Sequence, residues 1–116
     1  MRPHALSFVL LLALGGTSFA ESHVCGTLEE CDAVIRNSRS IAAYERRGYL
    51  YLMRRDLDEA IADFSAAIAI EARPFSLYAR GMARLMAGDA AGQNEMEAAI
   101  MLQRDIAEEF RGYGNR

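Results

Sequence analysis

The chain has 116 residues, enough for one domain and too few for two. Hydrophobic residues make up 52% and charged residues 25%, which is the composition of a folded globular protein rather than a disordered one. The formal net charge of −3 and the absence of a basic cluster argue against a nucleic-acid-binding protein.

The first twenty residues have the layout of a secretory signal. Arg2 supplies a positive charge, residues 5–14 are almost all apolar, and small residues stand at Ser18 and Ala20 before the chain turns polar at Glu21. The apolar run is only about half as long as the roughly 20 residues of a membrane-spanning helix. We therefore expect cleavage after Ala20, a periplasmic or secreted protein, and no membrane span in the mature chain.

Residues 21–40 are expected to form an N-terminal segment with a leading helix that caps the domain. Thr27 and Glu30 have the spacing of a capping box at a helix start. The apolar residues that follow recur at intervals of three and four, which predicts a helix with one apolar face that frays near Asn37.

Cys25 and Cys31 are the only cysteines of the chain. In an exported protein, a closely spaced even pair is most simply a disulfide, and this one would staple the start of the leading helix. Free thiols stay open as an alternative, as do two chemical uses of the pair. A redox pair is disfavoured by the C-x5-C spacing, which differs from C-x-x-C, and a metal site formed with His23 would lack a fourth ligand. We expect no metal and no cofactor.

The rest of the chain predicts only helices, because alternating strand-like runs are missing. Apolar periodicity and helix breakers predict a helix over 41–54, a second from Asp56 to the break before Pro74, and a third over 75–86. A fourth follows Gly88, has Asp89 as its N-cap and ends near residue 102, with Ile100 on its buried side. The last covers 105–111 and stops at Gly112. Links of two to five residues imply antiparallel neighbours.

Two stretches of the sequence are similar to each other. Residues 44–51 align with residues 77–84, so that Gly48 and Gly81 stand 33 positions apart, and residues 63–68 align with 95–100 at an offset of 32. A helix pair that recurs at this interval resembles the tetratricopeptide repeat. We expect Gly48 and Gly81 to lie where paired helices cross closely, and Phe64 to fill the space between the helices.

The resemblance covers residues 41–103 and continues into the last helix. The first repeat, 41–73, follows the family pattern at six positions: Tyr44, Gly48, Tyr51, Ala60, Phe64 and Ala67. The second, 74–103, departs from it, because Gly92 replaces the usual alanine and Met96 the aromatic residue. The family implies an all-α fold, a short right-handed solenoid of antiparallel helix pairs. The leading helix would precede the repeats, and the domain of residues 41–116 would close with a C-terminal cap helix.

The resemblance also implies a non-enzymatic scaffold for protein–protein interactions. In the family, the first helix of each pair lines a concave groove that holds a peptide or helix of a partner protein. Leu52 and Leu85 are expected in the core. The side chains expected to contact the partner are Glu45, Tyr49, Met53, Tyr78, Met82 and Met86. Their apolar, methionine-rich character favours an apolar ligand. For Tyr49, Tyr78 and Met82 a position in the core is the open alternative. No nucleophile has a recognisable base and orienting acid, so we expect no catalytic residues.

Two other functions stay open. Stacks of this kind usually need about three repeats, so two chains could pair through their exposed ends and form a self-associating structural protein. A thiol-based redox or metal-binding protein that uses Cys25 and Cys31 is the other. A tail of the chain itself could also occupy the groove.

Overall fold

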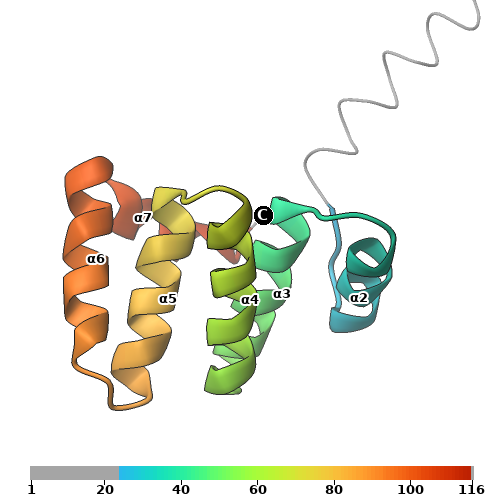
Figure 1. The fold of residues 1–116 in the computed structure, drawn as a ribbon, viewed down its shortest axis with the longest axis horizontal. Coiled ribbons are helices and arrows are strands. Elements are labelled where there is room, and N and C mark those ends of the chain that lie inside the picture. The colour runs from blue at the N-terminus through green and yellow to red at the C-terminus, as the bar shows by residue number, and fades with distance from the viewer. Residues whose placement is uncertain (1–23, 116) are drawn as a thin grey trace, which may run out of the picture.

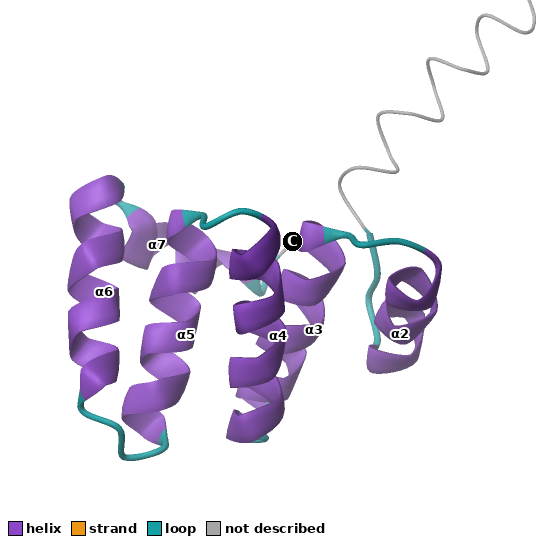
Figure 2. Ribbon diagram, viewed as in Figure 1, coloured by secondary structure: helices purple, strands orange, loops and turns teal. Residues whose placement is uncertain are grey.

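The computed structural model describes residues 24–115, which form six α-helices and contain no strand (Figures 1 and 2). The helices are α2 (Leu28–Asn37), α3 (Ile41–Met53), α4 (Leu57–Ile70), α5 (Pro74–Met86), α6 (Ala91–Leu102) and α7 (Ile106–Tyr113). The expected secretory signal, its cleavage site and His23 lie outside the described residues. Within residues 24–115, every helix is too short or too polar for a membrane crossing.

Helices that follow one another in the chain pack side by side, which confirms the predicted all-α fold with antiparallel neighbours. We call α3 and α4 the first helix pair, and α5 and α6 the second. In Figure 1, α2 lies at one end of the row and α6 at the other. The last helix, α7, does not continue this row. It contacts α5 more than α6 and runs behind α5 toward α3.

Local signals in the sequence account for the helix starts. The hydroxyl oxygen of Thr27 accepts a hydrogen bond of 3.1 Å from the backbone N–H of Glu30, which confirms Thr27 as the N-cap of α2. The Glu30 carboxylate reaches back to the backbone N–H of Gly26 at 2.7 Å. Asp56 also precedes its helix but makes no side-chain cap, and its carboxylate lies 3.2 Å from Nε of Arg54.

The two helix pairs turn in the same way. Arg55 and Gly88 stand 33 positions apart in the sequence, and both have the left-handed backbone conformation, with φ of 66° and 91°. An aspartate follows each of them. Asp89 accepts a hydrogen bond of 3.0 Å from the backbone N–H of Ala91, where α6 begins. The N-cap of α6 is Ala90, one residue after the predicted Asp89. Glycine adopts this conformation without the steric cost that Arg55 carries.

The main core lies among α3–α7 and includes the fully buried side chains of Leu52, Phe64 and Ile106. A separate small cluster of Cys25, Cys31 and Ala43 attaches α2 to α3. The buried position of Leu52 is as predicted.

Three sequence-based expectations near the C-terminal end were wrong. Leu85 was expected in the core and Ile100 on a buried helix face, but their side chains are 38% and 39% exposed. Gly112 does not end the last helix, which continues to Tyr113 because the Tyr113 side chain packs into the core. The exposure of Ile100 accompanies the turn of α7 away from α6 and toward α3.

Candidate protein-binding surface

A glycine sets the close approach of the helices in each pair. A Cβ atom on Gly48 would lie 2.9 Å from the ring of Phe64, and one on Gly81 would lie 2.7 Å from the backbone oxygen of Gly92. Met96 occupies the place of Phe64 in the second pair, where its Cγ would lie 2.8 Å from that Cβ on Gly81. Both contacts confirm the predicted close crossings. They fix the position of the first helix of each pair relative to the second.

An ion pair recurs beside each of these crossings. Arg47, the residue before Gly48, donates two hydrogen bonds of 2.8 Å to the carboxylate of Asp63, through Nε and Nη2. Arg80, the residue before Gly81, donates through Nε at 3.0 Å to the carboxylate of Glu95. The alignment of the two stretches contains both pairs at the same offsets, although neither ion pair was among the predicted contacts. That alignment was the signal that could have found them.

Glu45 joins the two helix pairs to each other. One carboxylate oxygen accepts a hydrogen bond of 2.9 Å from Nη2 of Arg73, and the other accepts one of 2.6 Å from the hydroxyl of Ser76 at the start of α5. The residue is only 4% exposed, and these two hydrogen bonds satisfy its buried carboxylate within the chain. Glu45, predicted to contact a partner, lies in the interior.

The helix α7 packs across the surface that α3 and α5 form, which we call the α3–α5 face. Ring centroids of Tyr113 lie 4.9 Å from Tyr49 of α3 and 4.5 Å from Phe75 of α5. Phe110 lies 5.6 Å from Tyr78 of α5. The rings meet at tilted or edge-on angles, which are favourable for aromatic pairs. A helix of the chain itself therefore occupies part of this face.

The position of α7 divides the residues predicted to contact a partner. Tyr78 is 7% exposed and packs under α7, while Tyr49 is half-buried there and Met82 is half-buried on α5. In contrast, Met53 and Met86 are 52% and 36% exposed. Contact with a partner stays a prediction for all six, but while α7 is in place only the two methionines offer much free surface.

The exposed part of the face lies at the ends of α3 and α5. Met53 is the last residue of α3 and Met86 the last of α5, with Leu85 exposed beside it. Nη1 of Arg55, two residues beyond Met53, lies 3.7 Å from Sδ of Met86, so the two helix ends are neighbours. We call Met53, Leu85 and Met86 the methionine end of the α3–α5 face.

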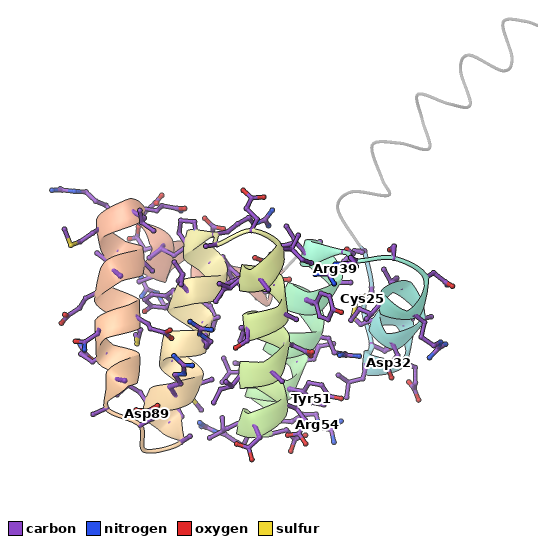
Figure 3. The ribbon with its side chains drawn as sticks, in the orientation of Figure 1. Cys25, Asp32, Arg39, Tyr51, Arg54 and Asp89 are labelled. Atoms are coloured by element: carbon purple, nitrogen blue, oxygen red, sulfur yellow. A yellow bond between two sulfur atoms is a disulfide. The ribbon has the colours of Figure 1, made fainter. Side chains whose placement is uncertain are left out.

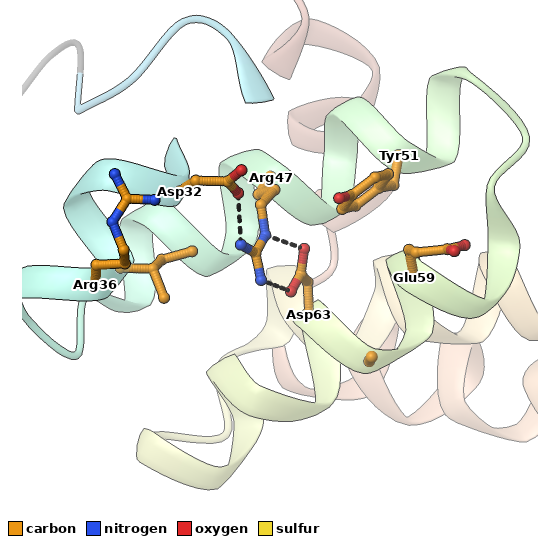
Figure 4. Close-up of a pocket in the computed structure, with 8 residues that line it drawn as sticks. Asp32, Arg36, Arg47, Tyr51, Glu59 and Asp63 are labelled. Carbon is orange, nitrogen blue, oxygen red and sulfur yellow. Dashed lines mark hydrogen bonds and ion pairs between the residues drawn. The ribbon is translucent and has the colours of Figure 1, made fainter. Parts of the chain in front are cut away.

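A cleft of about 400 Å³ lies between α2 and the first helix pair (Figure 4). Arg47 bridges its two sides, because Nη1 donates a hydrogen bond of 2.7 Å to Asp32 of α2 while Nε and Nη2 bind Asp63 of α4. The hydrogen bond with Asp63 is the main cause that raises the pKa of Arg47 above its ordinary value. The residues that line the cleft are Asp32, Ile35, Arg36, Arg47, Tyr51, Glu59, Ala62 and Asp63.

The paired charges in this cleft join α2 to α3 and α4. Among the described residues, every buried polar side-chain atom has a hydrogen-bond partner. Figure 3 shows Asp32 on α2 facing the helix α3 that carries Tyr51. A second hollow of about 530 Å³, lined in part by Met53 and Arg54, shares Asp32 and Tyr51 with the first.

The sulfur atoms of Cys25 and Cys31 lie 2.09 Å apart and form a disulfide, which confirms the predicted pairing. Nε of Arg46 donates a hydrogen bond of 3.2 Å to the backbone oxygen of Cys25, so the disulfide-linked segment is held against α3. Within residues 24–115, no cluster of three or more His, Cys, Asp or Glu side chains has the arrangement of a metal site.

Comparisons with protein-family models, curated proteins and solved structures give no match to this chain. The chemistry of its surfaces is therefore the guide to function. The α3–α5 face is apolar, holds an aromatic helix of the same chain at one end, and exposes methionine and leucine at the other.

Proposed function

We propose that this chain is a non-enzymatic scaffold for protein–protein interactions, which binds an amphipathic helix or apolar peptide of a partner protein on the α3–α5 face. The observation that carries the proposal is the packing of α7 on this face. Phe110 and Tyr113 of that helix insert among Tyr49, Phe75 and Tyr78. A face that binds one helix through aromatic anchors has the shape and chemistry for helix-in-groove recognition.

The methionine end is where a partner first gains access. Its exposed apolar side chains lie on the α3–α5 face beyond the rings that contact α7. Methionine is flexible and polarisable, so Met53 and Met86 can repack around side chains of different shape. A partner segment would cover this end in the complex, either beside α7 or in exchange for it.

The proposal extends to the family and the compartment of the protein. Equivalent pairs 33 positions apart (Gly48 and Gly81, Arg47 and Arg80, Arg55 and Gly88) support two tetratricopeptide-like repeats of a short right-handed solenoid. In this arrangement α2 precedes the repeats, and α7 follows them but packs across the α3–α5 face instead of on the outer side of α6. The signal-like residues 1–20 and the disulfide support export to an oxidising compartment, the periplasm or the outside of the cell.

The test is capture of a partner by crosslinking in an envelope extract, with mass spectrometry as the readout. The face variant, Met53→Lys plus Met86→Lys, should lose a heterologous protein that the parent captures. Its circular dichroism should be unchanged, because both side chains are exposed. Tyr49→Arg is less suitable, since it would place a charge under α7.

The matched control is the α6 variant, Met101→Lys plus Leu102→Lys, which makes the same chemical change on exposed residues of another helix. It should capture the same partner as the parent. Equal capture by the parent and both variants would contradict the assignment of the α3–α5 face. Recovery of the chain alone, with no second protein, would contradict the scaffold function.

A further inference from the structure

The outer end of α6 exposes an unusual run of apolar residues. Ile100, Met101 and Leu102 are consecutive, and their side chains are 39%, 87% and 65% exposed. No other large hydrophobic residue among the described ones is as exposed as Met101. Three consecutive exposed apolar residues in a folded domain indicate a surface that something covers. Figure 1 shows that α6 is the last helix of the row, with no helix beyond it.

The first helix pair shows how the equivalent residues are used inside the molecule. At an offset of 32, Ile68, Ala69 and Ile70 of α4 correspond to the three exposed residues of α6. Ile68 and Ile70 are half-buried, and the one exposed position is a small alanine. The next helix, α5, packs along α4, whereas α7 turns away from α6. The end of α6 is therefore as apolar as the equivalent end of α4, along which α5 packs, although no described helix packs along α6 on its outer side.

The two ends of the row differ in charge. The exposed residues of α2 include Glu29, Glu30 and Arg36, which make that end polar. The exposed residues of α6 include a single charge, at Glu97, whose carboxylate accepts a hydrogen bond of 3.0 Å from Gln93. Stacked helical repeats need polar outer faces to stay apart in solution, and the cores of protein interfaces are depleted in charge. By both criteria α2 closes its end of the row and α6 leaves the other end open.

We infer that α6 is a self-association surface, on which α6 of a second copy of this chain packs about a two-fold axis. Head-to-tail stacking is blocked because α2 covers the other end of the row. Hydrogen bonds from Arg47 to Asp32 and from Arg46 to the backbone oxygen of Cys25 hold α2 in that place. A two-fold axis pairs the same patch with itself, and a patch with one charge meets little repulsion. The paired chains would form a stack of four helix pairs, more than the roughly three that such stacks need.

The size of the surface sets the strength of this pairing. A helix of 12 residues is about 18 Å long, so contact between two α6 helices covers less than the roughly 800 Å² per partner of a standard interface. We expect a weak dimer, with a dissociation constant in the micromolar range or above, in exchange with the monomer. Its population must therefore depend on concentration.

Sedimentation equilibrium of the purified protein, from low micromolar to near-millimolar concentration, tests the inference. The weight-average mass of the parent should rise from monomer toward dimer and stop there. The α6 variant, Met101→Lys plus Leu102→Lys, should stay monomeric with unchanged helicity, because these side chains are exposed in the single chain. The face variant, Met53→Lys plus Met86→Lys, should dimerise like the parent.

A crosslinking experiment places the contact. Met101→Cys should give a covalent dimer under mild oxidation at concentrations where the parent pairs, and Met53→Cys should not. A parent that is monomeric over the whole range would overturn the inference, as would a dimer that survives in the α6 variant. Equal loss of the dimer in both double variants would place the interface elsewhere. None of these results bears on partner capture, which the face variant tests separately.

Discussion

The guanidinium group of Arg47 and the carboxylate of Asp63 form two parallel hydrogen bonds of 2.8 Å, which join α3 to α4. The Asp63 side chain is 6% exposed and that of Arg47 is 21% exposed, so the pair is largely shielded from water. The same guanidinium also binds Asp32 of α2. One side chain thus connects three helices, and the equivalent Arg80 joins α5 to α6 through Glu95.

Replacing Arg47 should destabilise the fold strongly. Arg47→Met keeps most of the side-chain length but leaves the buried carboxylate of Asp63 without its partner, at a cost of about 3 kcal/mol in the free energy of unfolding. Arg54→Met is the control, because Arg54 pairs with Asp56 at the surface and should contribute less than about 0.5 kcal/mol. Urea denaturation measures both. Similar midpoints for the two variants would show that the Arg47 pair is not a structural tie.

Gly81→Ala should also destabilise the protein. The new Cβ would lie 2.7 Å from the backbone oxygen of Gly92, and α5 and α6 would have to move apart, at a cost of about 1–3 kcal/mol. Gly112→Ala is the matched control, since Gly112 lies within α7 with no atom within 4 Å of its Cβ position. Alanine favours a helix over glycine by up to about 1 kcal/mol, so this variant should be slightly more stable than the parent. Thermal unfolding that ranks the two in the opposite order would argue against the close crossing.

Phe110→Ala should release α7 from the α3–α5 face. Phe110 is 6% exposed and packs against Tyr49, Phe75 and Tyr78, so its truncation should cost about 3 kcal/mol. Amide hydrogen exchange should become fastest in α7, before α3–α6 lose protection. Met101→Ala, at an exposed position, should change stability by less than about 0.5 kcal/mol. Unchanged exchange in α7 of the Phe110 variant would mean that the aromatic contacts do not hold this helix.

Removal of the disulfide should act on α2 alone. The loop that Cys25 and Cys31 close is short, so Cys25→Ala plus Cys31→Ala should cost about 2 kcal/mol on the chain-entropy model. Hydrogen exchange should rise in α2 while α4–α6 keep their protection, because the small cluster under α2 is separate from the main core. The intact parent should be lighter than its reduced form by the mass of two hydrogen atoms in mass spectrometry. A global loss of protection would show that α2 supports the whole fold.

Much of the local structure could be predicted, because its causes lie within a few residues of one another. The cap at Thr27, the break at Pro74 and the turn at Gly88 act over one helical turn, and the helix boundaries largely follow them. The predicted contacts of Gly48 and Gly81 also hold, since a glycine at the same place in two similar helix pairs indicates a close crossing.

Which apolar residues are free to bind a partner was harder to predict, because an apolar residue on a helix can face either a partner or the chain itself. Tyr78 and Met86 lie two turns apart on α5, yet one is covered by α7 and the other is exposed. Nothing near either residue in the sequence indicates where residues 106–113 pack. The burial of Glu45 was equally hard to predict, since its hydrogen-bond partners Arg73 and Ser76 lie about thirty positions away.

The sequence by itself determined that the described chain is helical and where most of its helices begin and end, and it favoured a disulfide between the two cysteines. These properties follow from backbone preferences, capping and short-range chain geometry. Only the tertiary structure decided which surfaces remain free, because burial depends on which helix faces meet. The turn of α7 toward Tyr49 covers one end of the α3–α5 face, while the methionine end and the outer end of α6 remain exposed.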